Sequence, residues 1–266
     1  MSLLTRHNVT VMGDGPQTMI FAHGFGCDQH MWRFVAPAFA DRYRVILFDH
    51  IGAGKADRTA YQRRKYSALT GYADDVLALS AALGVTNGIF VGHSVSAMIG
   101  VLAAIKEPER FAALVLIGPS PCYINDGDYV GGFSRADIDG LLEMLDSNYL
   151  GWSHAMAPVI MGNPDRPELG AELENSFCRT DPEIARQFAR VTFLSDNRAD
   201  VARLPVPAAI LQCSQDAIAP ESVGAYLART IPVNRLIPLR ATGHCPNLSA
   251  PEETIAAIEL FLAEAA

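Results

Sequence analysis

The chain has 266 residues, of which 50% are hydrophobic and 19% are charged, so it is long enough for one large domain with a buried core. Its formal net charge of −8 argues against a nucleic-acid partner, because there is no excess of basic residues to bind a phosphate backbone. No apolar run approaches the roughly 18 residues that a membrane span requires, so we expect no membrane partner.

The N-terminal segment, the cysteines and the glycines bear on location and cofactors. MSLLTRHNVTV has no apolar core followed by a small-residue cleavage site, so we expect no signal peptide. Five cysteines, at 27, 122, 178, 213 and 245, form neither a CxxC pair nor a Cys/His set with zinc-like spacing. We therefore expect a cytoplasmic protein with reduced thiols and no metal. The glycine-rich stretch IGAGKAD lacks both nucleotide-binding patterns, so we expect no cofactor.

Short apolar runs along the chain predict the strands of a parallel sheet. They are residues 18–24, 44–50, 88–94, 113–120, 208–214 and 234–240. These runs are nearly continuous rather than alternating, which is typical of strands covered on both faces. At the N-terminal end, a Gly13-Asp14-Gly15 turn between two strand-like runs predicts an antiparallel hairpin.

Helical patterns fall between these strands. In 70–84, apolar residues recur on one face at the spacing of an amphipathic helix. Residues 95–105, VSAMIGVLAAI, are apolar on all sides, which predicts a buried helix directly after the strand at 88–94.

From about residue 121 to 196 the alternation of strands and helices stops. Residues 134–149 have helical spacing, with Ser134 and Asp137 as a capping pair, and 152–161 and 167–177 are also helical in pattern. A fourth helix begins with Asp181 as N-cap and Pro182 at its first position. Four helices without a strand predict a cap over 121–196, inserted in a core domain of residues 1–120 and 197–266.

The sequence GHSVS at 92–96 is a near match to the Gly-x-Ser-x-Gly nucleophile elbow, with Ser96 in place of the last glycine. Ser94 lies between a predicted strand and a buried helix, the context in which this motif exposes a nucleophilic hydroxyl. The alternative is that Ser94 is an ordinary helix N-cap. At 3.6 residues per turn, Ser96 lies about 200° round the helix from Ser94, so we expect it to point away from the site.

Asp216 and His244 complete a candidate catalytic triad with Ser94. Each follows a predicted strand, and in parallel α/β sheets the carboxyl ends of the strands form the ligand site. Alone, Asp216 is equally typical of a turn and His244 of a loop, but the chain order Ser, Asp, His is that of α/β-hydrolases. The pattern predicts an α/β-hydrolase fold: a mostly parallel sheet of the eight-stranded type, helices on both faces and the inserted cap.

An acyl-transfer site also needs two backbone N–H groups that bind the oxyanion. One follows the nucleophile, at Val95, and we assign the other to Phe25 in the loop HGFGCDQ. His23 and His93 have apolar neighbours, and we interpret them as structural histidines.

Beyond these residues, the chain resembles the RsbQ group of α/β-hydrolases, bacterial stress-response regulators that are similar to the plant karrikin and strigolactone receptors. The resemblance rests on HGFGCDQHMW, GHSVSAMIGV, LIGPSPCYIND, YVGGF, NYLGW, FCRTDPEIARQFARVTFLSDNR, LQCSQDAIAP and GHCPNLSAPEET. It implies a V-shaped lid of four helices over a deep apolar pocket, and slow hydrolysis by Ser94, Asp216 and His244.

The resemblance also implies pocket walls and a partner. Four aromatic residues match pocket positions of that group, namely Phe25, Phe133, Trp152 and Phe193, although core packing under a lid is the alternative. RsbQ acts with a PAS-domain phosphatase, and no feature of this sequence shows that such a regulatory partner exists here.

Three functions are compatible with these sequence patterns. The first is hydrolysis of a small apolar ester or lactone through an acyl-enzyme. The second is ligand sensing, in which occupancy or turnover moves the lid and changes a partner protein. The third is carbon–carbon bond hydrolysis, which would require a cationic residue in the pocket, and helical phase directs most cap arginines toward solvent.

Overall fold

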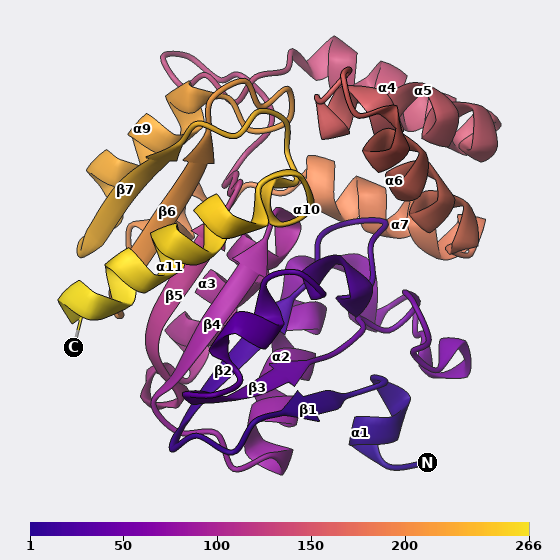
Figure 1. Ribbon diagram of the computed structural model, residues 1–266. Coiled ribbons are helices and arrows are strands. Elements are labelled where there is room, and N and C mark those ends of the chain that lie inside the picture. Colours follow the sequence, from indigo (N-terminus) through magenta and orange to yellow (C-terminus); the bar gives the residue numbers. More distant parts are fainter. Residues whose placement is uncertain (266) are drawn as a thin grey trace.

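The computed structural model describes residues 1–265, in which a twisted sheet carries helices on both faces and a helical cap at one end (Figure 1). The sheet order is β1-β3-β2-β4-β5-β6-β7. The strands are β1 (Thr10–Met12), β2 (Gln17–Ala22), β3 (Tyr43–Leu47), β4 (Gly88–His93), β5 (Phe111–Ile117), β6 (Ala208–Cys213) and β7 (Asn234–Leu239). All neighbours are parallel except β1 and β3, so the predicted sheet type is confirmed. The sheet has seven strands in the described part of the chain, rather than eight.

The predicted N-terminal hairpin is wrong, because β1 pairs antiparallel with β3 and not with β2. Strand β2 already has parallel neighbours on both sides, β3 and β4, so β1 can join only at the free edge of β3. The connecting turn crosses the start of β3 closely: a Cβ on Gly15 would lie 2.1 Å from the carbonyl oxygen of Arg42. Glycine permits this approach because it has no side chain.

Each face of the sheet has its own apolar core, because successive side chains along a strand point to opposite faces. Met19 and Phe21 pack with α11 (Pro251–Ala265) and the segment around Trp32. Ile20 packs on the other face with α2 (Leu69–Ala82), α3 (Val95–Lys106) and α9 (Glu221–Thr230). The short helices are α1 (Leu3–Arg6), α8 (Arg198–Val201) and α10 (Pro246–Ser249).

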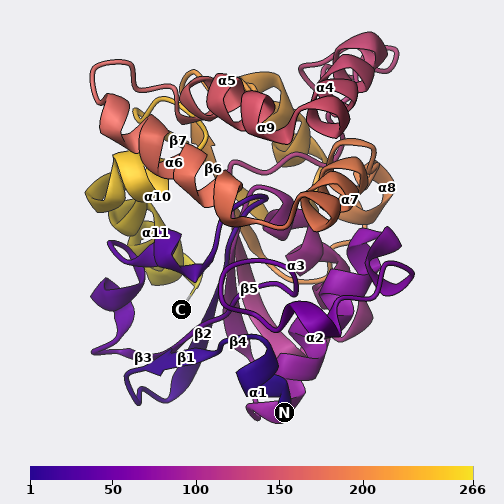
Figure 2. The same ribbon diagram turned by 90° about the vertical axis from the view of Figure 1, so that its right-hand side faces the viewer.

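The four predicted cap helices are present and lie over the carboxyl ends of the strands (Figures 1 and 2). They are α4 (Arg135–Ser147), α5 (Tyr149–Met161), α6 (Pro167–Arg179) and α7 (Pro182–Phe193). Ser134 and Asp137 form the predicted capping box, and Asp181 caps α7 as predicted. The boundary Asn148 accepts a hydrogen bond from the N–H of Gly151, which begins α5 as a separate helix. The domain boundaries at 121 and 196 stay a prediction.

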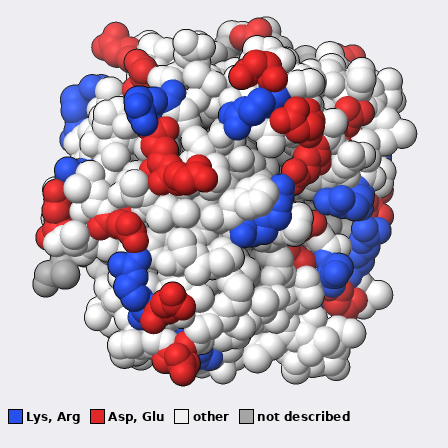
Figure 3. Space-filling view, in the orientation of Figure 1, with Lys and Arg blue, Asp and Glu red and all other residues white. Residues whose placement is uncertain are grey.

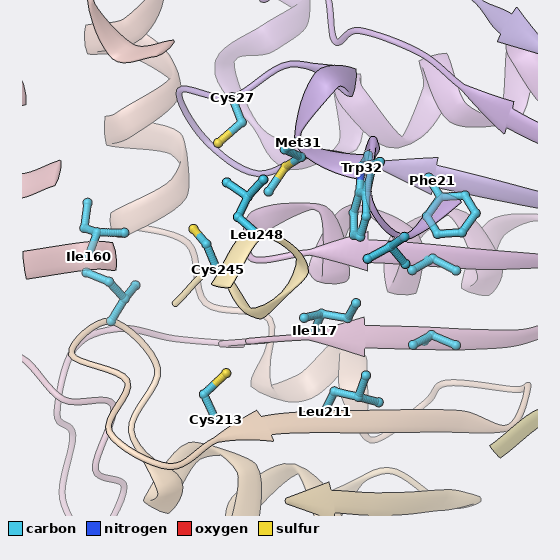
Figure 4. Packing of buried hydrophobic residues seen from close by; sticks show 14 of the residues in the cluster. Phe21, Cys27, Met31, Trp32, Ile117, Ile160, Leu211, Cys213, Cys245 and Leu248 are labelled. Atoms are coloured by element: carbon cyan, nitrogen blue, oxygen red, sulfur yellow. The ribbon is translucent and has the colours of Figure 1, made fainter. Parts of the chain in front are cut away.

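The cap packs onto the core without a break. One apolar cluster runs from Val91 in β4 to Leu145, Trp152 and Phe177 in the cap. Figure 4 shows Ile160 of α5 on the same side of the core as Cys27, Cys245 and Leu248. The site described below lies at this junction.

Charged groups are mixed on the face seen in Figure 3, where acidic and basic side chains lie side by side rather than in a patch of one sign. Among the described residues, no helix combines the length and the apolar character needed to cross a bilayer.

Candidate active site

Ser94 lies at a strained turn between β4 and α3. Its backbone has φ +57° and ψ −125°, and the only other described non-glycine residues with positive φ are two asparagines, which tolerate that region. A Cβ on Gly92 would lie 2.6 Å from the carbonyl oxygen of Ser96, so glycine is required where the strand meets the helix. This is the geometry of a nucleophile elbow, and the strain is held by the buried strand and helix on either side.

The three predicted triad residues lie in one hydrogen-bonded line. His244 Nε2 lies 2.8 Å from Ser94 Oγ, and His244 Nδ1 lies 2.7 Å from Asp216 Oδ2. All three residues are buried. The line has the connectivity of a nucleophile, a base and an orienting carboxylate.

Asp216 is held as a carboxylate by its surroundings. Its Oδ1 accepts hydrogen bonds from the N–H groups of Ile218, at 2.8 Å, and Ala219, at 3.0 Å. Burial acts to raise the pKa of Asp216, but the attraction of His244 and these hydrogen bonds outweigh it, so the pKa lies below its ordinary value. An ionised Asp216 fixes the proton of His244 on Nδ1, which leaves Nε2 free to accept the proton of Ser94.

His93 packs against His244 and is hydrogen-bonded to its backbone. Its Nε2 donates to the carbonyl oxygen of His244 at 2.7 Å, and the two rings lie 5.0 Å apart. Burial, together with the proximity of His244, lowers the pKa of His93 to about 3, so this ring is neutral at physiological pH. This geometry agrees with the interpretation of His93 as a structural histidine.

Ser96 points away from the triad, as its helical phase predicts. Ser96 Oγ donates to the carbonyl oxygen of His23 at 2.5 Å, and His50 Nε2 lies 2.8 Å from Ser96 Oγ. Because the single proton of Ser96 goes to His23, the ring of His50 must be the donor in the second bond. His50 showed no functional pattern in the sequence, since its contact depends on a serine 46 residues away.

The loop after β2 lies directly against the elbow. A Cβ on Gly24 would lie 3.2 Å from Ser94 Cβ and 2.6 Å from His93 Nδ1. On the elbow side, Val95 is the first residue of α3, where backbone N–H groups have no partner within the helix. Phe25 and Val95 therefore flank Ser94, and their role as oxyanion donors stays a prediction.

A narrow cavity lies between Ser94 and the cap. Its lining residues are Phe25, Cys27, His93, Ser94, Tyr123, Ile160, Leu173, Phe177, Thr192, Phe193, Ile218, His244 and Cys245. The volume of this cavity that a water molecule can reach is only about 30 Å³. A larger open depression of about 840 Å³ lies near Arg33 and Lys55, but no triad residue lines it, so the small cavity is the candidate site.

The predicted pocket aromatics occupy two layers. Phe25 and Phe193 line the cavity, whereas Phe133 and Trp152 are not among its lining residues. The Trp152 side chain is fully buried behind the first layer, 5.9 Å from the ring of Phe25 and 5.2 Å from that of Phe177. Phe133 lies in the segment before α4, where its backbone bridges to Ile124.

Cap and catalytic loops are joined by hydrogen bonds. The N–H of His244 donates to the carbonyl oxygen of Ile160 in α5 at 2.8 Å. Ser176 Oγ in α6 donates to the carbonyl oxygen of Gly26 at 2.8 Å. The cap thus holds both the loop that carries the base and the loop that carries Phe25. Among the described residues, no cluster of His, Cys, Asp or Glu is arranged to hold a metal ion.

Comparison with known proteins agrees with this geometry. The family model described as the alpha/beta hydrolase family matches residues 19–257, which is most of the chain. The chain belongs to the α/β-hydrolase family. A hydrolase from Oleispira antarctica superposes with a TM-score of 0.96 and 40% identity, and the match covers 98% of this chain and 96% of that one.

Two plant proteins give the comparison more detail. This α/β-hydrolase is 39% identical to a karrikin insensitive 2 receptor of Petunia hybrida, over 94% of this chain and 93% of the relative. It is 38% identical to a strigolactone esterase of Arabidopsis thaliana, over 95% and 94% of the two chains. With such relatives and its family match, the chain is an α/β-hydrolase of the esterase type.

Proposed function

We propose that this α/β-hydrolase cleaves a small ester or lactone through an acyl-enzyme on Ser94. The observation that carries the proposal is the line from Ser94 Oγ through His244 to Asp216, with hydrogen bonds of 2.8 and 2.7 Å. A serine hydroxyl alone is a weak nucleophile, and this arrangement supplies the base that activates it.

In the first half of the reaction, Ser94 Oγ attacks the carbonyl carbon while its proton moves to His244 Nε2. The carbonyl oxygen becomes negative and binds to the N–H groups of Phe25 and Val95. When the tetrahedral intermediate collapses, the bond to the alcohol oxygen breaks and His244 returns the proton to that oxygen. In the second half, water attacks the acyl-enzyme by the same route, which frees the acid and restores Ser94.

The cavity limits the substrate to small groups with apolar portions. Aromatic, aliphatic and cysteine side chains form most of its wall, and the accessible space is far below the roughly 300 Å³ typical of sites for drug-sized ligands. A ligand larger than a few atoms therefore requires the cap to move outward. None of the cap arginines lines the cavity, so the geometry gives no support to carbon–carbon bond hydrolysis of an acidic substrate.

A second element of the proposal is that turnover is slow, as the resemblance to the RsbQ group implies, and that it reports ligand occupancy. Cap helix α5 is hydrogen-bonded to His244, and cap helix α6 to Gly26, so an acyl group that displaces either loop also displaces the cap. Ligand binding shifts such an equilibrium only if the two cap positions differ in affinity. One relative is named as a receptor and another as an esterase, and the resemblance to the RsbQ group adds a regulatory partner, such as a PAS-domain phosphatase.

The test compares p-nitrophenyl acetate and butyrate hydrolysis by the wild type, Ser94→Ala and Ser96→Ala. We expect the first variant to lose activity and the second to keep most of it. Equal rates in wild type and Ser94→Ala would overturn the hydrolase proposal. For the sensing element, we expect a partner to be recovered from the native cell in a ligand-dependent manner, and a ligand-independent result would overturn it.

A further inference from the structure

Two hydroxyl groups in the wall of the cavity over Ser94 have no hydrogen-bond partner. They are the phenol of Tyr123 and the Oγ1 of Thr192, and each residue has an exposed fraction of only 1%. Both residues line the cavity. A buried polar group without a partner is unfavourable, because folding has removed its bonds to water and supplied none in return.

Tyr123 lies between β5 and the cap, with its ring 5.1 Å from that of Phe193. Burial raises the pKa of Tyr123 well above its ordinary value, and the nearby Ser94 hydroxyl opposes that rise. The phenol lines the same cavity as Ser94 and keeps its proton, so it is available as a hydrogen-bond donor.

Thr192 lies in the last turn of α7, on the cap side of the cavity. Threonine hydroxyls in helices commonly bond to the carbonyl one turn earlier. Thr230 does so to Tyr226 at 2.8 Å, and Thr254 to Ala250 at 3.0 Å. Thr192 makes no such bond, so its hydroxyl is not used by its own helix.

No other side chain in the wall forms a hydrogen bond with either hydroxyl. Ser94 and His244 bond to each other, and His93 donates to the backbone of His244. The other lining side chains are aromatic or aliphatic, apart from two thiols. In a wall of this kind, an unpaired donor is satisfied when a ligand brings an acceptor.

We propose that Tyr123 and Thr192 form a subsite that binds a second oxygen of the substrate, beyond the scissile ester group. This inference rests on the proposed hydrolase function and narrows its substrate class. The preferred substrate is an ester or lactone with an ether or carbonyl oxygen a few bonds from the reacting carbon, because both hydroxyls can donate to such an acceptor. A site built to bond an oxygen discriminates strongly against the analogue that lacks it.

The test uses two esters of nearly equal shape, p-nitrophenyl methoxyacetate and p-nitrophenyl butyrate, in which an ether oxygen replaces one methylene. Their values of kcat/KM are each divided by the rate constant for hydroxide hydrolysis, which removes the difference in intrinsic reactivity. The variants are Tyr123→Phe and Thr192→Val. Tyr72→Phe is the matched control, because that hydroxyl is also buried and unpartnered but does not line the cavity.

We expect the normalised ratio of methoxyacetate to butyrate to fall by about fivefold to tenfold in each cavity variant, and to stay at the wild-type value in Tyr72→Phe. The ratio is the readout, because any change in rate that the two esters share cancels in it. The melting temperature of both cavity variants should equal or exceed that of the wild type. A marked fall in melting temperature would mean that the hydroxyls stabilise the folded protein, and it would overturn the subsite.

The subsite and the hydrolase proposal fail in different ways. If both esters are hydrolysed in a Ser94-dependent manner and the ratio is the same in all variants, only the subsite is overturned. If the wild type hydrolyses neither ester faster than Ser94→Ala does, the hydrolase proposal fails and the subsite with it.

Discussion

The two sides of the cavity over Ser94 are built differently. On the core side, Ser94, His244 and Asp216 are hydrogen-bonded to one another, and these residues follow buried strands. The wall formed by cap helices α5, α6 and α7 is mostly aromatic and aliphatic, and its one hydroxyl, from Thr192, is unpaired. We infer from this comparison that the core supplies the proposed chemistry and that the cap selects the substrate.

The largest expected effect comes from the two serines of the elbow. Ser94→Ala removes the nucleophile and should lower kcat by about a thousandfold or more. Ser96→Ala should keep most of the activity and lose stability, about 1–3 kcal/mol, because the carbonyl of His23 and the ring of His50 lose their partner. Steady-state kinetics and urea unfolding measure the two effects, and the reverse pattern would exchange the roles of the serines.

Asp216→Asn tests whether the carboxylate orients the base. An amide can donate to His244 and favour the wrong tautomer, so kcat should fall by about 10³–10⁴-fold with KM little changed. Far-ultraviolet circular dichroism should match that of the wild type. A loss below about tenfold in a folded variant would show that the acid is not part of the chemistry.

Gly26→Ala sharpens the comparison where the core loop meets the cap. Gly26 has φ +70°, and a Cβ there would lie 2.0 Å from the ring of Phe177. The loop must shift, so the Phe25 N–H should leave the oxyanion position and reduce kcat by about 10²-fold. Gly127→Ala is the control, because Gly127 also has a positive φ, +56°, and nothing lies within 4 Å of its Cβ position. Equal losses in the two variants would point to backbone strain alone.

Acid should destabilise the fold through His93. Its pKa is about 3 in the folded protein and 6.5 in the reference state, so between these values the unfolded chain binds a proton that the folded chain does not. This contribution to stability is complete above pH 6.5 and is lost as the pH falls, at up to about 1.4 kcal/mol per pH unit. Urea unfolding from pH 7 to 4 should show a shallower loss in His93→Gln than in the wild type. The exposed His30→Gln is the control, and equal slopes in all three proteins would refute this assignment.

The smallest effect is expected for Ser176→Ala in cap helix α6. The substitution removes the 2.8 Å hydrogen bond to Gly26, so the closed position of the cap should lose about 1 kcal/mol of stabilisation. KM should therefore rise by a few fold, while kcat stays nearly constant. Ser147→Ala, whose hydroxyl bonds within its own helix at 3.2 Å, should leave both constants unchanged. A fall in kcat, rather than a rise in KM, would mean that the cap acts on the chemical step itself.

The same division explains what the sequence could predict. Ser94, Asp216 and His244 follow strands in a recognisable order, and parallel strands bring their carboxyl ends to one edge, so sequence alone was enough to bring them together. Ser134 and Asp181 cap their helices through neighbours a few residues away, and those predictions are confirmed.

Contacts between distant segments were not predictable in this way. β1 joins the edge of β3 because β2 has no free edge. A local turn pattern contains no information on which strand has a free edge. Phe193 lines the cavity whereas Trp152 and Phe133 do not, and this difference depends on how the segments of the cap pack. The partnership of His50 with Ser96 and the unpaired hydroxyls of Tyr123 and Thr192 emerge only from packing as well.

The central claim is that Ser94 carries the acyl group, and intact-protein mass spectrometry during turnover of p-nitrophenyl butyrate tests it most directly. The wild type should gain the mass of one butyryl group, and peptide mapping should place it on Ser94. Ser96→Ala should show the same adduct and Ser94→Ala none. A butyryl group on Ser96, or turnover by the wild type without any adduct on Ser94 under rapid quenching, would contradict the account.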